Sequence, residues 1–177
     1  MLQPRRFRAD RLHADDGAIY ELVKQAFKSS PHASGDEQDL VVRQRKTSAY
    51  VPELSLVADA DGEIIGHIMF TQIKIGDETQ LVLAPLAVLP ARQKQGVGKA
   101  LILRGHDIAK RAGYGFSVLV GHPSYYPKFD YRAASAFGLT CAQSVPSECF
   151  MACDLQKSGR MLNAQMSIPA VFFDKEA

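Results

Sequence analysis

The stretch Gln93-Lys94-Gln95-Gly96-Val97-Gly98 carries more information about the fold than any other part of this chain. It lies between an apolar run typical of a strand, Leu81 to Leu89, and a run with helical periodicity, Gly98 to Ala112. A glycine-rich turn at such a junction presents unpaired backbone N–H groups at the positive end of a helix dipole. Because glycine has no Cβ, a phosphate can approach this main chain closely. The stretch therefore predicts a site for a phosphate-bearing ligand.

Two common phosphate-binding loops do not fit these residues. A Walker A loop needs a glycine five positions before Gly98, where the chain has Gln93. It also needs a Ser or Thr directly after the lysine, where the chain has Ala100. A Rossmann fingerprint needs a third small residue three positions after Gly98, where the chain has Leu101.

A third pattern, Gln/Arg-x-x-Gly-x-Gly/Ala, is matched at its fixed positions by Gln93, Gly96 and Gly98. This is the pyrophosphate loop of the GNAT acyl-CoA-dependent N-acetyltransferases, and the chain resembles that family over about residues 5–155. The resemblance implies acetyl-CoA as a co-substrate, no metal, and a pyrophosphate held by loop amides with added charge from Arg92. The cofactor-binding residues that it implies in the loop are Gln93, Lys94, Gln95, Gly96, Val97, Gly98 and Lys99.

A proline lies inside the strand that precedes the loop. Pro85 has no N–H and would interrupt a sheet ladder, so the run Leu83 to Pro90 is either an edge strand or a strand that parts from its neighbour. In GNAT enzymes this strand splays, and its exposed backbone groups pair with the pantetheine arm of the cofactor. We therefore expect a splay near Pro85, with Leu86, Ala87 and Val88 binding the cofactor through backbone atoms.

The segment Gly121-His122-Pro123-Ser124-Tyr125-Tyr126 resembles a second hallmark of the family, an aromatic–tyrosine pair followed four residues later by Gly-Phe. Tyr126 occupies the position of the catalytic tyrosine, and Asp130-Tyr131 replaces Gly-Phe. Aspartate tolerates a positive φ better than most residues, so the turn can survive. The Gly-His-Pro-x-Tyr-Tyr form is similar to a bacterial subgroup of predicted acetyltransferases. The resemblance implies that Tyr126 donates a proton to the departing thiolate; the alternative is a buried aromatic with a satisfied hydroxyl.

The sequence leaves open which group deprotonates the acceptor. Many GNAT enzymes carry a glutamate on the strand before the loop, but Leu81 to Leu89 contains no acid. An amine of pKa about 10 must still lose a proton near pH 7. The open candidates are His122, His67, Glu37 and a water chain. A covalent intermediate is disfavoured, because no cysteine lies near the loop or Tyr126 in the sequence.

Length and composition indicate one globular domain with a sizeable core. The chain has 177 residues, 46% of them hydrophobic and 23% charged, with a net charge of +2 and scattered basic residues. Scattered charge disfavours a nucleic-acid partner, and no run approaches the roughly 18 apolar residues of a membrane span. Three cysteines without CxxC spacing disfavour a disulfide scaffold or zinc knuckle and favour a reducing compartment. The first residues lack an apolar signal core, so we expect a cytoplasmic protein.

The order of elements predicts an α/β or α+β fold. We expect a strand, two helices, three antiparallel strands, the glycine loop and its helix, a strand, a short helix over Ser124 to Phe129, and two strands within Phe137 to Leu155. The resemblance implies the GNAT fold, in which a mixed, mostly antiparallel sheet of six to seven strands splays at strand 4 and is flanked by about four helices. We expect residues 1–158 to form this domain and residues 159–177 to form a C-terminal extension packing on or near it.

The function implied by the resemblance is N-acetylation. An acetyl group would pass from acetyl-CoA to a primary amine of a small molecule or peptide by direct attack, and the resemblance also allows a homodimer. Residues 29–39 and 159–177 are expected to shape the acceptor pocket. Two alternatives stay open. A non-catalytic acyl-CoA-binding or sensing module is favoured by the missing strand acid, and a nucleotide-binding protein would also use the glycine loop.

Overall fold

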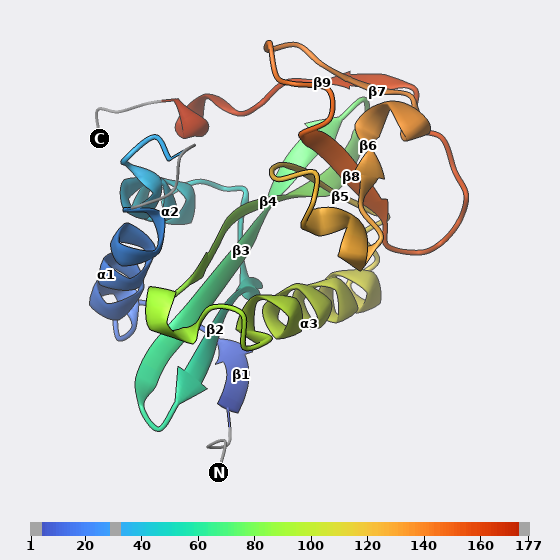
Figure 1. Ribbon diagram of the computed structural model, residues 1–177. Helices are drawn as coiled ribbons and strands as arrows, with labels where there is room; N and C mark the ends of the chain where they lie inside the picture. The colour runs from blue at the N-terminus through green and yellow to red at the C-terminus, as the bar shows by residue number, and fades with distance from the viewer. Residues whose placement is uncertain (1–4, 29–32, 174–177) are drawn as a thin grey trace.

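A computed structural model describes residues 5–28 and 33–173 of the chain (Figure 1). Its first half contains β1 (Arg5–Ala9), α1 (Asp16–Phe27), α2 (Glu37–Arg45), β2 (Tyr50–Ala60), β3 (Glu63–Ile75), β4 (Glu78–Val88) and the 3-10 turn η1 (Pro90–Arg92). Its second half contains α3 (Val97–Arg111), β5 (Phe116–Val120), η2 (Tyr126–Phe129), β6 (Arg132–Ala133), η3 (Ala134–Phe137), β7 (Leu139–Cys141), β8 (Phe150–Asp154), β9 (Ala164–Met166) and η4 (Ala170–Phe172).

Seven strands form the central sheet in the order β1-β2-β3-β4-β5-β8-β6. All neighbouring pairs in it are antiparallel except β4 and β5, which are parallel. The β4–β5 pairing consists of Leu81 with Ser117 and Val82 with Val118, whereas β4 stays paired with β3 as far as Val88. The two central strands therefore part after Val82, and the predicted GNAT fold with a sheet splayed at strand 4 is confirmed. The Ala84–Pro85 peptide bond at this point is cis.

Helices cover both faces of the sheet (Figure 1). Alternate residues of β2 point to opposite faces, as the period of a strand requires. Leu56 packs in the same cluster as Leu101 of α3, while Val57 packs with Ile19 of α1 and Val41 of α2. Helix α3 therefore covers one face, and α1 and α2 cover the other. The glycine loop connects β4, the strand that splays, to the start of α3. The loop therefore lies at the open part of the sheet.

The expected number of helices is corrected. The described residues contain three α-helices, and the segment expected as a further helix, Ser124 to Phe129, forms only the 3-10 turn η2. Pro127 in its first turn has no N–H, and Asp130 directly after it has a φ of 66°, which ends the turn. The positive φ expected at Asp130 is thus confirmed. The two strands expected within Phe137 to Leu155 are β7 and β8, and they lie in different sheets.

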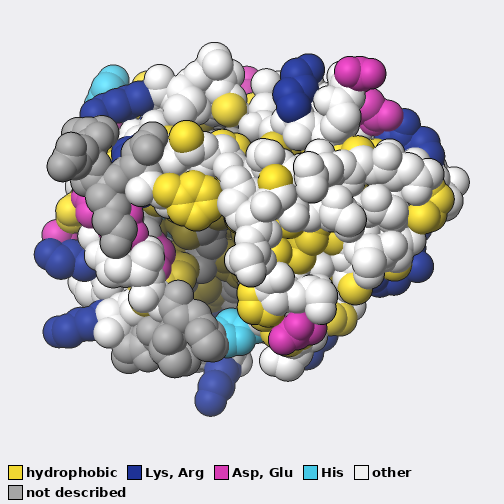
Figure 2. All heavy atoms as spheres, turned by 90° about the horizontal axis from the view of Figure 1, so that it is seen from above, with side chains coloured by type: hydrophobic (Ala, Val, Ile, Leu, Met, Phe, Trp, Pro, Cys, Tyr) yellow, Lys and Arg dark blue, Asp and Glu magenta, His cyan; other side chains and the backbone are white. Residues whose placement is uncertain are grey.

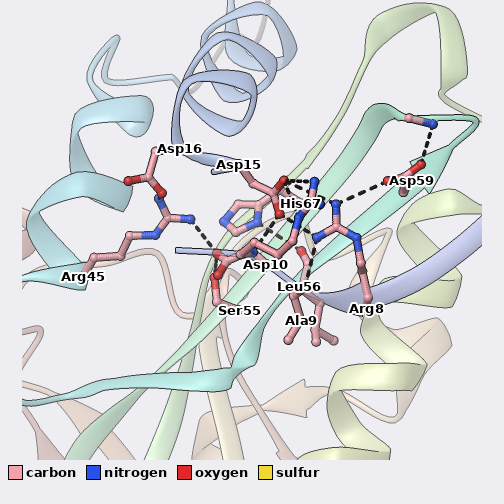
Figure 3. Close-up of polar contacts among 12 residues, drawn as sticks. Arg8, Ala9, Asp10, Asp15, Asp16, Arg45, Ser55, Leu56, Asp59 and His67 are labelled. Atoms are coloured by element: carbon pink, nitrogen blue, oxygen red, sulfur yellow. Dashed lines mark hydrogen bonds and ion pairs between the residues drawn. The ribbon is translucent and has the colours of Figure 1, made fainter. Parts of the chain in front are cut away.

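A buried polar network ties α1 and α2 to the edge of the sheet (Figure 3). Arg45 at the end of α2 donates to Asp10 and Asp16, each at 2.5 Å, and Asp10 also accepts a bond from the Ser55 hydroxyl on β2. Arg8 on β1 pairs with Asp15 at the start of α1, and these bonds keep the pKa of the buried Asp15 well below its ordinary value. The two helices are thereby held against the sheet.

The residues after β8 return across the molecule to α2. Strand β9 pairs in parallel with β7, and Met166 packs in the cluster formed by β5, β8 and η3. The chain then passes along the open end of the sheet to η4, beside α2 (Figure 1). Among the described residues, none of the helices has the length and apolar character that a membrane crossing requires.

Candidate active site

The glycine loop has the backbone geometry of an anion-binding turn. Lys94 and Gly96 both have positive φ values, 58° and 82°, and α3 begins directly afterwards with Gly96 as its N-cap. The first N–H groups of a helix have no intrahelical partner, so they face the loop. The side chain of Gln93 donates to the carbonyl of Val88 at 3.2 Å and braces the loop against the end of β4. Gln93 thus contributes a structural bond within the loop, and its backbone lines the site.

A pocket of about 530 Å³ opens in front of this loop. Four cations line it, and among its described lining residues there is no Asp or Glu, so the pocket carries a positive field suited to a polyanion. Lys128 is the cation that the sequence analysis missed; it lies only a few positions after the tyrosine pair. The lining residues are Leu86, Val88, Arg92, Gln93, Lys94, Gly96, Val97, Gly98, Lys99, Tyr125, Lys128 and Phe129.

Two of the predicted cofactor residues do not line this pocket. Ala87 points to the other face of the sheet and packs with Ile19 of α1, so only its backbone faces the splay. Gln95 is engaged by Arg5, which donates to its backbone carbonyl at 2.7 Å and to its side-chain oxygen at 3.0 Å. Beyond Val82, β4 has no strand partner on the β5 side, so its backbone there is open to a ligand that pairs like an added strand.

A second pocket of about 460 Å³ lies at the other end of the splay. It is lined by the parting ends of β4 and β5, by α1, α2 and the loop between them, and by the C-terminal segment. Figure 2 shows a hollow on this face of the molecule, with hydrophobic side chains visible inside it. Residues from the two segments that the sequence analysis assigned to an acceptor pocket line it: Ser34, Glu37, Met166, Ile168, Pro169, Phe172 and Phe173. Residues 29–32 and 174–177 of those segments lie outside the described part of the chain.

The two tyrosines of the Tyr-Tyr pair face different pockets. Tyr125 lines the cofactor-side pocket, and Tyr126 lines the second one. Their rings meet edge to face with centroids 5.2 Å apart. Leu86 lines both pockets, so the splayed end of β4 and the tyrosine pair form the boundary between them. The sequence analysis assigned no site role to Tyr125, which lies directly before the 3-10 turn η2 that begins at Tyr126.

Tyr126 is suited to hold a proton. Burial raises the pKa of its hydroxyl well above the ordinary value, and the neighbouring Tyr125 raises it further. Gly121 lies against its ring: a Cβ on that glycine would come within 3.0 Å of the ring atoms of Tyr126. The ring is therefore fixed between the end of β5 and the pocket. The hydroxyl stays protonated at neutral pH, which is the state required of a proton donor.

The three side chains considered as a general base are separated by the fold. Glu37 and His122 both line the second pocket with Tyr126. His67 does not: it is fully buried in β3, its Nδ1 lies 3.0 Å from the carbonyl of Leu56, and burial lowers its pKa to about 4 (Figure 3). None of the three cysteines lines either pocket, and all three are free thiols. The structure thus places two of the candidate side chains, Glu37 and His122, in the pocket that Tyr126 lines.

The sequence profile of the acetyltransferase (GNAT) family matches residues 17–125, which is more than half of the chain. The matched span runs from α1 through the splayed strand and the glycine loop to the tyrosine pair. The chain belongs to the GNAT family. The matched span includes the glycine loop and ends at Tyr125, the first residue of the tyrosine pair.

Relatives of known sequence and structure agree with this assignment. Two uncharacterized N-acetyltransferases of Escherichia coli are similar to the chain. YjhQ is 33% identical over 76% of this chain and 75% of its own length. YhbS is 30% identical over 72% of this chain and 74% of its own length. A crystal structure of YhbS in complex with CoA superposes with a TM-score of 0.86 at 25% identity, covering 99% of this chain and 96% of that one. The crystal structure of a GNAT acetyltransferase from Brucella melitensis in complex with acetyl-CoA superposes with a TM-score of 0.79 at 28% identity. The match covers 96% of this chain and 99% of that one.

Proposed function

We propose that the protein transfers an acetyl group from acetyl-CoA to a primary amine by direct attack. The observation that carries the proposal is the pair of pockets on either side of the splay. One is cationic and faced by helix N–H groups; the other is largely apolar and contains Tyr126. An acyl donor in the first and an amine in the second would meet at Leu86, which lines both. The complexes of the similar proteins with CoA and acetyl-CoA support this placement of the donor.

Each part of the donor site has a proposed role. The N-terminal amides of α3, with Arg92, Lys94, Lys99 and Lys128, would hold the pyrophosphate. The backbone from Leu86 to Val88 would pair with the pantetheine arm, and one of its N–H groups would polarise the thioester carbonyl. Acetyl-CoA supplies an activated acyl group with a good leaving thiolate. Holding both reactants on the two sides of the splay makes a bimolecular reaction effectively unimolecular.

The chemical step needs one proton donor and one proton acceptor. The amine nitrogen forms a bond to the acetyl carbon, the carbon–sulfur bond breaks, and Tyr126 donates its proton to the sulfur. A base removes the proton that the nitrogen loses. We propose that Glu37 or His122 fills this role, because both line the pocket with Tyr126. Comparison of Glu37→Gln with His122→Gln separates them: the variant that lowers kcat without weakening acetyl-CoA binding identifies the base.

We propose that residues 159–177 act as an extension that completes the acceptor side of the domain. Strand β9 attaches this extension to β7, and its later residues, among them Ile168 and Phe172, line the acceptor pocket. The placement explains why the acceptor pocket is walled on a side that the central sheet cannot reach.

The test is thiol release from acetyl-CoA in the presence of a panel of amines and short peptides. Release that depends on the amine, with mass-spectrometric detection of the N-acetyl product, is the expected result. Stabilisation of the fold by CoA without release from any amine would instead identify a non-catalytic acyl-CoA-binding module. Stabilisation by ATP that CoA does not compete away would identify a nucleotide-binding protein.

A further inference from the structure

The acceptor pocket has an unusual balance of apolar surface and charge. Most of its described lining residues are apolar, and they come from the splayed strands, α1, α2 and the C-terminal segment. Representative members are Phe27, Leu40, Leu83, Leu119, Met166 and Phe172. Its volume of about 460 Å³ falls in the ~300–1,000 Å³ range of sites for small organic molecules. The pocket is therefore wide enough for an aryl or branched alkyl body.

The ionisable side chains among the described lining residues of this pocket are Glu37, His122 and Tyr126. Glu37 is the single carboxylate among the described lining residues, and no Lys or Arg is among them. Its Oε1 accepts from the backbone N–H of Ser34 at 2.6 Å, and its Oε2 accepts from that of Gly35 at 3.2 Å. Oε1 also accepts from the Ser34 hydroxyl at 3.1 Å. A carboxylate has about four acceptor positions, so with three of them used Glu37 retains capacity for one further donor such as an ammonium. The pocket can balance one positive charge.

This balance excludes two large classes of amine acceptor. A polyamine or aminoglycoside would bring further ammonium groups into an apolar site that has no acid to pair with them. A free amino acid would bring a carboxylate into a site with no Lys or Arg among its described lining residues. In both cases a charge is desolvated without a partner, which costs more than apolar contacts return. The donor-side pocket is the opposite case, with four cations for a polyanion.

We propose that the acceptor is a monoamine with an apolar body and no carboxylate, of the arylalkylamine or branched alkylamine class. This inference rests on the proposed function, because it assigns the second pocket to the amine. Glu37 attracts the single ammonium, and the apolar wall selects the body. Tyr126 lines the same pocket as Glu37, so the amine and the proposed proton donor would share one site.

A matched series of amines tests the charge requirement directly. Tryptamine, tryptophan amide and tryptophan share one aryl body and differ in whether they carry a carboxylate. We expect kcat/KM for tryptamine and tryptophan amide to exceed that for tryptophan by about 10²-fold or more, because a buried unpaired charge is rejected strongly. Spermidine, which carries extra ammonium groups on an unbranched chain, is expected to be as poor as tryptophan.

A charge-introducing variant tests the same requirement from the protein side. Phe173 lines the pocket but is 56% exposed, so Phe173→Arg adds a cation at the rim without emptying the core. It should raise kcat/KM for tryptophan relative to tryptamine by about 10-fold, the effect of one new ion pair at a partly desolvated site. Leu103→Arg is the matched control, because Leu103 is 48% exposed on α3 and lines neither pocket.

Product binding gives a readout that does not depend on turnover. N-acetyltryptamine should raise the melting temperature of the protein, and N-acetyltryptophan should not. If tryptophan or spermidine is acetylated as well as tryptamine, the acceptor assignment is overturned while the acetyltransferase function stands. If no amine releases thiol but N-acetyltryptamine still binds selectively, the proposed function fails and the pocket assignment stands.

Discussion

Arg43 of α2 donates from its Nε to the backbone carbonyl of Val171, at 3.1 Å, across 128 residues of sequence. The arginine is 7% exposed, and its Nη2 also donates to Asp36 at 2.9 Å. Val171 lies in η4, directly before Phe172 and Phe173, which line the acceptor pocket. One buried side chain therefore connects α2 to the C-terminal segment, and both of these elements contribute residues to the pocket.

Replacing Arg43 should loosen the acceptor pocket selectively. Arg43→Met keeps most of the apolar stem but removes both hydrogen bonds. Each hydrogen bond from a charged group contributes ~1.5–3 kcal/mol to stability, here to the attachment of the C-terminal segment. Because that segment lines the pocket, its loss should raise the KM for the acceptor amine about tenfold or more. KM for acetyl-CoA should not change, because the donor-side pocket does not contain this residue. Steady-state kinetics with each substrate varied in turn measures the KM for the amine and the KM for acetyl-CoA separately. Arg104→Met is the control, because it removes an arginine that is 51% exposed on α3.

Changes at the two loop glycines should abolish cofactor binding for different reasons. Gly96→Ala places a side chain on a residue with φ +82°, which strains the N-cap of α3. Gly98→Val inserts a side chain where the hydroxyl of Tyr125 lies, 2.8 Å from the position of a Cβ. CoA at a hundredfold excess over Kd should stabilise the wild-type fold by about 2.7 kcal/mol, and both variants should lose this gain.

Gly17→Ala is the matched control for the loop glycines. No atom lies within 4 Å of a Cβ at Gly17, which is in the first turn of α1. This variant should keep the full response to CoA in a thermal-shift titration. Undiminished stabilisation of a folded Gly96 or Gly98 variant would overturn the assignment of the loop.

Removal of the Tyr126 hydroxyl should slow the chemical step. Tyr126→Phe keeps the ring that packs on Gly121 and deletes the proton donor. General acid catalysis contributes typically ~10²- to 10⁴-fold, so kcat should fall by that order with little change in the Kd of CoA. Tyr125→Phe should instead weaken CoA binding, because Tyr125 lines the donor pocket. Tyr114→Phe, outside both pockets, controls for loss of a hydroxyl, and an unchanged kcat in Tyr126→Phe would identify a packing residue.

Stability should fall between about pH 6.5 and pH 4 because of two buried histidines. Burial lowers the pKa of both His67 and His106 to about 4. In the unfolded chain a histidine binds its proton near pH 6.5, so in this window the unfolded state holds more protons than the folded state. The free energy of unfolding therefore decreases as the pH is lowered. The slope approaches ~1.4 kcal/mol per pH unit for each histidine.

The substitution His106→Gln tests that assignment. Glutamine can keep a bond to the Tyr131 hydroxyl, which lies 3.1 Å from Nε2 of His106, and it does not titrate. The slope of unfolding free energy against pH, from urea titrations between pH 6.5 and 4.5, should fall by about half. Asp154 and Glu78, whose pKa values are lowered in the folded protein, lose their contribution only at lower pH. An unchanged slope would show that other groups dominate this window.

Gly105 in the middle of α3 should resist replacement by alanine. Helix propensity alone predicts that Gly105→Ala stabilises an exposed helix by up to about 1 kcal/mol. In this fold a Cβ at Gly105 would overlap the ring of Phe70 on β3, which is fully buried. Overpacking of this kind costs about 1–3 kcal/mol, so the midpoint of urea unfolding should decrease. A midpoint that increases would show that the Phe70 ring can move aside.

The sequence by itself determined the parts of the protein that depend on neighbouring residues. Gln93, Gly96 and Gly98 predicted a phosphate loop from three local signals. In the structure Gln93 bonds to Val88, Gly96 has a positive φ, and a Cβ at Gly98 would lie 2.8 Å from the Tyr125 hydroxyl. Pro85 predicted the splay because it cannot join a ladder. The periodicity of apolar residues located β5 and α3 to within a residue or so at each end. All of these signals act over a few residues, so they can be read without knowing the rest of the fold.

Tertiary structure alone decided which distant residues meet. Tyr125 and Tyr126 are adjacent in sequence but line different pockets. Glu37 and Phe172 line one pocket although more than a hundred residues separate them, and Arg43 reaches Val171 over a similar span. Such contacts follow from sheet order and from loops that close over long separations. No local pattern of residues records them, so the proposed acceptor pocket, with Glu37 as the carboxylate among its described lining residues, emerges only when the chain is folded.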